Sequence, residues 1–344
     1  MLILEIQTSK YLTNIALPHD LTWHELPGAD RAAAAMVIID TCMHLSSHDS
    51  DAYPPCGDAV PYFRDGRPDL SRDASPEHLR RCMDAQEVRV DRAFNFCNGW
   101  YGWDNRLAID LLKGNDEWLA CGVLLDPSSP SSPDELRRLV KAGACGLRIQ
   151  PIVTGEPLDH PAATLLWKAA AELGIAIDVN LAQHEYHQVA RRAAEFPTVP
   201  IVLDHCGWLV GSDPETLTVD VPCSLAVYPN VYVKITFCHV ASHEPYPHRD
   251  THFLVHQLIN TFGADRCLWG SNFTGGDQQA SSYTYEDAFQ LFYTHMGLSE
   301  EDRSWVMGRT AEKLFHWRQG TGVAAEPAAS VLRVSPPSRM RVKL

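Results

Sequence analysis

The sequence predicts an α/β fold, a (β/α)8 TIM barrel built from a single stretch of the chain. Three observations support this: eight short apolar runs alternate with amphipathic stretches, polar residues end most of the runs, and the length of 344 residues suits one barrel. The predicted strands are 36–40, 89–96, 118–126, 145–150, 175–180, 200–205, 231–237 and 266–272. A doubly wound open sheet is the alternative, but no GxGxxG motif follows any of these runs.

The stretches between the strands have helical periodicity, as in 132–143, 162–174 and 184–196. In the first of these, the spacing of Ser132 and Glu135 predicts a capping box, and Gly143 predicts the end of the helix. These elements place the barrel domain at 36–318. Residues 1–35 form an N-terminal extension, and the Pro-, Ser- and Ala-rich tail 319–344 is predicted to be disordered.

Composition and charge narrow the classes of partner. The net charge of −14 argues against nucleic acid and against anionic membrane surfaces, which would repel the protein. The ten cysteines are scattered without a CxxC pair, which favours reduced thiols. We find no signal peptide and no apolar run long enough to span a membrane, so a cytoplasmic protein with a small-molecule substrate is expected. A homo-oligomer is compatible with the sequence.

Candidate site residues lie where the predicted strands end, because the chemistry of a TIM barrel collects at the carboxyl ends of its strands. The first strand runs into Asp40-Thr41-Cys42-Met43-His44. The later strands end in polar residues, namely Arg148, Gln150, Asp178, Asn180, His205, Lys234 and Asn272. Alternation along a strand puts residues two apart on one face, so Arg148 pairs with Gln150 and Asp178 with Asn180.

The order of these segments resembles the amidohydrolase-related family (amidohydrolase family 2), in particular its branch of 2-pyrone-4,6-dicarboxylate lactonases. The matching segments are 38–45, 146–150, 196–207, 230–237, 262–273 and 306–315, so the resemblance spans about residues 36–318. It implies a metal-dependent-hydrolase-like barrel. The lactonase branch is itself implied to work without metal.

The chain departs from the family pattern where a metal would be held. The resemblance implies His-x-His in the first strand, but Cys42 precedes His44 here; Asn272 stands where the family has an Asp that binds metal or activates water. Asn180 stands where metal-dependent relatives often supply a His. A neutral amide is a poor metal ligand. A metal-free pocket is therefore favoured, with Zn²⁺ or another divalent cation on Cys42, His44 and His205 as the alternative.

Each candidate side chain has a catalytic or a structural interpretation. His44 and His205 suit proton transfer or polarisation of a carbonyl, or are buried histidines bonded to the backbone. Cys42 is a nucleophilic thiolate or an inert buried thiol. Asp178 is a base, the role that Asn272 cannot fill, or a structural counter-ion.

The remaining candidates concern substrate binding, together with Gln150 and Asn180. Arg148 suits bidentate capture of a carboxylate, or forms an ion pair with Asp178. Lys234 supplies a second positive charge or pairs with the same Asp. Trp100, Tyr101 and Trp103 form a stacking wall for a planar ring or a packed loop, with Trp103 the preferred contact.

Three functions fit this pattern. The first is hydrolysis of a small carboxylated lactone or cyclic amide. The second is a lyase, isomerase or cyclase reaction, such as decarboxylation or dehydration, because such chemistry needs no activated water and Asn272 replaces the usual acid. The third is a catalytically inactive barrel that binds a ligand.

Overall fold

Eight parallel strands form one sheet in the order β1 to β8, which confirms the predicted barrel. This computed structural model describes residues 36–56, 73–96, 99–151, 157–205, 218–236, 238–273 and 283–317. The predicted extension 1–35 and the predicted tail 319–344 lie outside the described residues. The strands are β1 Ile39–Met43, β2 Arg92–Phe96, β3 Leu119–Leu124, β4 Gly146–Ile149, β5 Ala176–Val179, β6 Ile201–Leu203, β7 Val231–Ile235 and β8 Cys267–Trp269.

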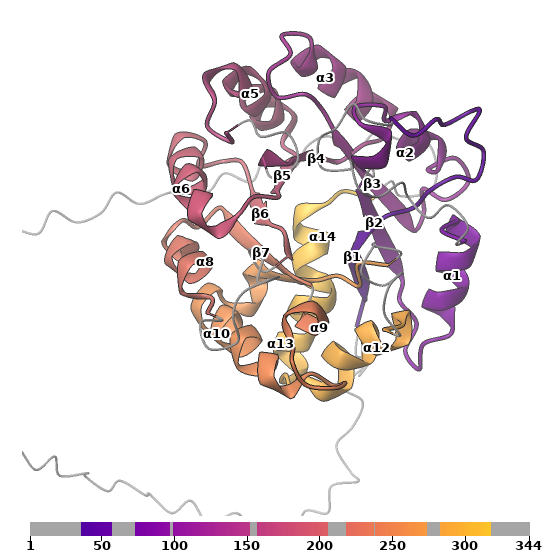
Figure 1. Cartoon of the computed structure of the whole chain (residues 1–344), viewed down its shortest axis with the longest axis vertical. Coiled ribbons are helices and arrows are strands. Elements are labelled where there is room, and N and C mark those ends of the chain that lie inside the picture. The colour runs from indigo at the N-terminus through magenta and orange to yellow at the C-terminus, as the bar shows by residue number, and fades with distance from the viewer. Residues whose placement is uncertain are drawn as a thin grey trace, which may run out of the picture. The chain divides into compact units, whose positions relative to one another are not determined.

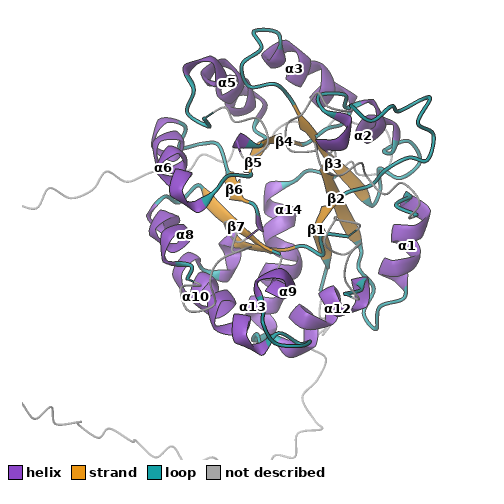
Figure 2. Cartoon of the chain, in the orientation of Figure 1, coloured by secondary structure: helices purple, strands orange, loops and turns teal. Residues whose placement is uncertain are grey.

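Most of the helices surround these strands, whereas α14 crosses the middle of the ring in the view of Figure 1 and Figure 2. Their bounds are α1 Pro76–Asp84, α2 Arg106–Asp110, α3 Ser132–Ala142, α5 Thr164–Leu173, α6 Tyr186–Glu195, α8 Asp220–Ser224, α9 Cys238–Ala241, α10 His252–Phe262, α12 Tyr285–Gln290, α13 Glu300–Ser304 and α14 Thr310–Leu314. In the part of the chain that is described, no helix has the length and apolar character needed to cross a bilayer.

Helix α3 shows where local sequence signals succeed and fail. The helix ends before Gly143, whose φ of 124° suits a glycine, as predicted. The predicted capping box at Ser132 and Glu135 is wrong. Ser132 is already the first helical residue, and its hydroxyl donates to the carbonyl oxygen of Asp126 at 2.6 Å. The box is absent because the helix begins at Ser132 and its N-cap is Ser131, which makes no side-chain cap hydrogen bond.

The seam between β8 and β1 is held partly by a side chain. Met43 and Phe273 form a single parallel bridge. Nearby, the Asp40 carboxylate accepts a hydrogen bond from the backbone N–H of Ser271 at 2.9 Å and from that of Cys42 at 3.1 Å. Because backbone donors cannot be left unpaired in the interior, Asp40 substitutes there for ladder hydrogen bonds.

One end of the barrel interior is closed by apolar side chains, which we call the apolar floor. Gly122 of β3 makes room for it, since a Cβ there would lie 2.4 Å from the ring of Phe96. The floor faces away from the carboxyl ends of the strands and so leaves those ends for polar groups. Its buried members are Ile39, Phe94, Phe96, Ala120, Cys145, Ala176, Val202, Tyr232, Leu268, Ala311, Leu314 and Phe315.

Candidate functional site

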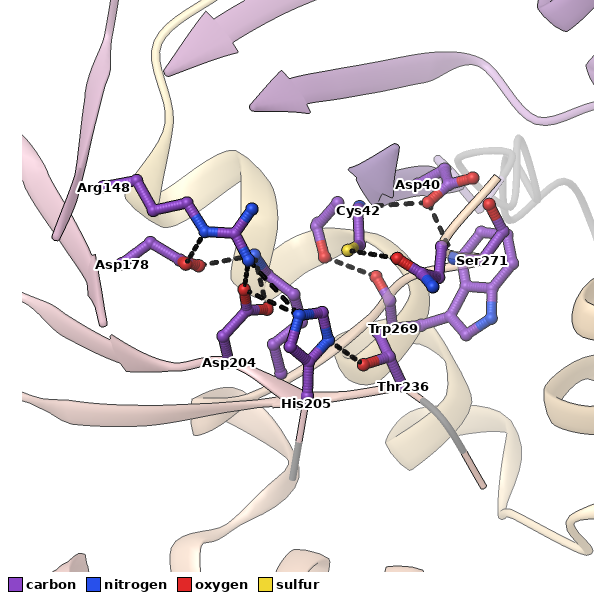
Figure 3. A network of polar contacts seen from close by, with 12 residues as sticks. Asp40, Cys42, Arg148, Asp178, Asp204, His205, Thr236, Trp269 and Ser271 are labelled. Carbon is purple, nitrogen blue, oxygen red and sulfur yellow. Dashed lines mark hydrogen bonds and ion pairs between the residues drawn. The ribbon is translucent and has the colours of Figure 1, made fainter. Parts of the chain in front are cut away.

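Four charged side chains meet inside the barrel, above the apolar floor; we call them the charge network. They are Arg148 of β4, Asp178 of β5, Asp204 just after β6, and Lys234 of β7, all of them buried. Arg148 pairs with Asp204 and lies 3.3 Å from Asp178, measured from Nε to Oδ1. The Lys234 ammonium lies 2.5 Å from Asp178 and 3.4 Å from Asp204. Figure 3 shows Arg148, Asp178 and Asp204 pointing toward one another.

Strand register and the apolar floor place these charges. Arg148 is directly opposite Asp178 in the β4–β5 ladder, so both side chains point to the same side of the sheet. Beneath them, the Phe96 ring faces both cations, with its centroid 4.3 Å from the Lys234 ammonium and 5.3 Å from the guanidinium carbon. Such cation–π contacts offset part of the cost of burying the charges.

The two carboxyl groups of the network have opposite protonation tendencies. Burial raises the pKa of Asp178 to about 7, with the Asp204 charge adding to the effect and Lys234 and Arg148 opposing it. Burial also acts on Asp204, but the Arg148 and Lys234 charges outweigh it and bring the pKa of this carboxyl below its usual value. Near neutral pH, Asp204 is therefore ionised while Asp178 is poised to gain or lose a proton.

His205 enters the barrel through an unusual backbone conformation. Its φ is 57°, in the left-handed region that few non-glycine residues adopt. Nδ1 lies 2.8 Å from the Thr236 hydroxyl, and Nε2 lies 3.2 Å from the Arg148 guanidinium. Burial lowers the pKa of His205 well below its ordinary value, and the Arg148 and Lys234 charges add to this against the pull of Asp204. His205 is therefore a neutral imidazole. Nε2 also lies 3.2 Å from the ionised Asp204 carboxylate, so this nitrogen faces an acceptor as well as a donor.

Cys42 and Asn272 form the next part of the site. The Cys42 thiol donates to the side-chain oxygen of Asn272 at 3.7 Å, and Asn272 has a φ of 56°, a second left-handed position at a strand end. Burial raises the pKa of Cys42 well above its ordinary value, and the Asp204 charge adds to this effect. The sulfur is therefore a neutral thiol at neutral pH, which favours the inert interpretation of Cys42 over the nucleophilic one.

The other sequence-predicted residues lie around this centre. Gln150 and Asn180 follow β4 and β5 and are buried. His44 follows β1 and is half-buried, and its charge acts on the His205 ring. Trp103 is 41% exposed, after the short 3-10 helix Gly99–Tyr101, and belongs to the loop rather than to the charge network. The sequence thus names most of the residues that converge in the barrel.

Asp204 is the principal residue that sequence reasoning missed. It directly precedes His205, which draws attention as the polar end of the strand. A usable signal was present, because alternation from Val202 puts Asp204 on the inner face, whereas His205 would point outward in an extended strand. The left-handed turn at His205 brings both side chains inside.

A comparison with models of known protein families identifies the same family as the strand-end residues do. Residues 39–317 match the model of the family described as amidohydrolase. The chain belongs to the amidohydrolase family. This confirms the family resemblance expected from the sequence. Among curated proteins, none matches the chain.

Solved structures of amidohydrolase-type barrels resemble this chain at low identity. A probable 2-pyrone-4,6-dicarboxylic acid hydrolase from Acinetobacter baumannii with citric acid bound is 17% identical with a TM-score of 0.68, covering 81% of this chain and 99% of that one. An amidohydrolase from Burkholderia multivorans with bound zinc is 18% identical with a TM-score of 0.63, at 81% and 98% coverage. The 5-carboxyvanillate decarboxylase from Novosphingobium aromaticivorans, complexed with manganese and 4-hydroxy-3-methoxy-5-nitrobenzoic acid, is 16% identical with a TM-score of 0.59, at 81% and 96% coverage. At such identities the likeness establishes the fold.

Two of these structures hold a divalent metal, so we compared this chain's donors with the needs of one. Among the described residues, Cys42, Asp204 and His205 have donor atoms within 4.8 Å of one another. His44, the expected ligand, is not in this group, and Asp204 takes its place. However, Asp204 already pairs with Arg148 and Lys234. A divalent cation would add charge to a buried cluster whose two cations and two carboxylates balance, so these residues fit a metal poorly.

Proposed function

We propose that this member of the amidohydrolase family is an enzyme that binds a small carboxylate-bearing lactone or cyclic amide and hydrolyses it without a metal. The observation that supports this is the charge network beside a neutral imidazole at the carboxyl end of the barrel. Polar groups fixed in a dry interior stabilise developing charge far better than the same groups in water.

Asp178 links the network to an anionic substrate. When the Asp178 carboxyl is protonated, the charge network carries one net positive charge, from Arg148, Lys234 and Asp204. This charge complements a substrate carboxylate. Because burial raises the pKa of Asp178 to about 7, protonating this carboxyl requires little free energy at neutral pH. We therefore expect substrate binding to take up a proton, with Arg148 as the contact for the carboxylate.

His205 is the proton carrier in this proposal. Its neutral imidazole accepts a proton from water as the water oxygen adds to the substrate carbonyl carbon. The ring C–O or C–N bond then breaks, and the proton passes to the leaving oxygen or nitrogen. His44 lies close enough to act on His205 electrostatically and shares the polarisation of the carbonyl. Gln150 and Asn180 line the substrate site in this proposal, with Trp103 at its rim.

A decarboxylase is the second candidate. Asn272 cannot serve as a base, and the Cys42 thiol is bonded to it, so neither supports activation of water. Loss of CO2 from an aromatic or enolisable acid needs a proton donor and a stabilised carbanion but no activated water. The similarity in fold to a 5-carboxyvanillate decarboxylase makes this reaction class worth a direct test.

The test measures both reactions on the purified full chain. 2-Pyrone-4,6-dicarboxylate, whose ring absorbs in the ultraviolet, reports hydrolysis, and release of CO2 from 5-carboxyvanillate reports decarboxylation. Ring opening that is lost in Arg148→Met supports the proposal, with Arg106→Met, an exposed arginine, as the matched control. CO2 release without ring opening supports the second candidate. Neither activity across panels of carboxylated lactones and aromatic acids, with retained ligand binding, supports an inactive binding barrel.

A further inference from the structure

Lys234 lies beside the three side chains that are grouped as a metal ion requires. Its ammonium is 3.4 Å from an Asp204 oxygen, and its charge acts on both Cys42 and His205. The side chain is completely buried and also pairs with Asp178. Such a lysine is a permanent cation in a fixed place, which is what a bound metal would otherwise provide.

We infer that Lys234 is a built-in substitute for a divalent cation, and that it keeps Cys42, Asp204 and His205 from binding zinc. Removing the ammonium opens a zinc site formed by these three donors. This inference rests on the proposed metal-free reaction and explains how the site remains without metal.

The donor chemistry supports the inference. Thiolate, imidazole and carboxylate are the ligands that zinc prefers, and three protein ligands with an open fourth position are typical of catalytic zinc. Bond lengths of about 2.0–2.3 Å to a tetrahedral ion put neighbouring ligand atoms about 3.3–3.8 Å apart. His205 Nε2 and Asp204 Oδ2 are already 3.2 Å apart, and the Cys42 sulfur lies within 4.8 Å of both. The Arg148 guanidinium contacts both the nitrogen and the oxygen, so an ion takes them only if the guanidinium turns toward Asp178, the carboxylate that loss of Lys234 leaves without its ammonium.

The net charge of the buried cluster determines whether a zinc ion binds there. With Lys234 present and both carboxylates ionised, the charge network is neutral, so adding Zn²⁺ and releasing the Cys42 thiol proton to solvent leaves one uncompensated positive charge in the interior. Without the ammonium, Lys234 no longer opposes the rise in the pKa of Asp178, so Asp178 is protonated and the network is neutral. Zn²⁺ that displaces the Asp178 proton and the Cys42 thiol proton leaves the buried cluster neutral.

The experiment titrates the full-length Lys234→Met variant with Co²⁺, a probe whose thiolate complexes absorb strongly in the near ultraviolet. We expect a thiolate charge-transfer band that saturates at about one equivalent, consistent with a single three-donor site. The band should disappear in the double variant that also carries Cys42→Ala. The wild type and Lys113→Met, which removes an exposed lysine, should show none. By calorimetry, zinc should bind Lys234→Met at least about a hundredfold more tightly than the wild type.

Lys234→Gln serves as a second variant, since its amide retains a hydrogen-bond donor for the carboxylates that Lys234→Met lacks. The inference is overturned if either variant, shown by circular dichroism to be folded, binds no more metal than the wild type. It is equally overturned if the wild type binds one equivalent of zinc that Cys42→Ala abolishes, a measurement that needs no lysine variant. Both outcomes concern metal binding alone, so they are distinguishable from failure of the hydrolysis assay.

Discussion

Replacing Asp40 by Asn tests the claim that burial raises the pKa of the carboxyl group at the seam between β8 and β1. The Asp40 side chain is fully buried, and one oxygen accepts the backbone N–H groups of Cys42 and Ser271. Burial raises the pKa of Asp40 to about 6, although hydrogen bonds from Ser271, Cys42 and Tyr285 partly oppose this. An Asn at this position retains an oxygen for the two N–H groups but has no charge to desolvate.

The sign of the effect follows from this raised pKa. Between the ordinary value of 3.8 and about 6, the folded state binds more protons at Asp40 than the unfolded state does. The stability that protonated Asp40 contributes is fully present below pH 3.8 and is lost as the pH rises through about 6. The total loss is about 3 kcal/mol, of which about 2 kcal/mol falls between about pH 4.5 and about pH 7.5.

The assay is urea unfolding at these two pH values, followed by tryptophan fluorescence. We expect the free energy of unfolding of Asp40→Asn, relative to wild type, to increase by about 2 kcal/mol from the lower pH to the higher. Asp51→Asn, at an exposed position, is the matched control and should show no such change. A difference between Asp40→Asn and wild type that does not vary with pH would refute the reasoning, because the folded-state pKa of Asp40 would then be ordinary.

The remaining predictions concern the charge network and the apolar floor. In wild type, kcat/KM for an anionic substrate should fall about tenfold per pH unit above about 7 as Asp178 loses its proton, and Asp178→Asn should flatten this limb. Arg148→Met leaves Asp204 and Asp178 with Lys234 as their only remaining cation in the network, and should lower the free energy of unfolding by about 3–5 kcal/mol in urea titrations. Gly122→Ala brings a methyl group against a floor ring and should cost about 1–3 kcal/mol by the same assay.

For each of these three predictions, one result would contradict the reasoning. If kcat/KM instead rises with pH through about 7, and Asp178→Asn removes this rise, Asp178 would be the general base. An Arg148→Met variant as stable as wild type would mean that the carboxylates are neutral in the folded state. Gly122→Ala with unchanged stability would show that the neighbouring ring moves at little cost.

The fold could be predicted from sequence because its determinants are local and repeated. The eight apolar runs, separated by amphipathic stretches, predict the parallel order that the structure shows. Gly143 likewise predicts the end of α3 from its own conformational preference. The capping box at Ser132 failed because the helix begins at Ser132 itself, one residue earlier than the pattern requires.

Much of the site could also be predicted, because strand ends are recognisable along the chain. The sequence placed Arg148, Asp178, His205 and Lys234 at the ends of strands, and the structure brings these four together. It left open whether Arg148 faces a substrate or a carboxylate of the protein. The structure gives it two carboxylates, because burial of a guanidinium requires compensation.

The sequence by itself determined the barrel, the family and the polar character of the strand ends, because apolar periodicity and residue type act over a few neighbouring positions. Only the tertiary structure decided that Asp204 joins the network, since this depends on the left-handed turn at His205. The tertiary structure also decided the protonation states, because the pKa of a group such as Asp178 depends on burial and on charges brought from four different strands. Coulomb interactions and desolvation act through space, and the distances that control them exist only once the chain has folded.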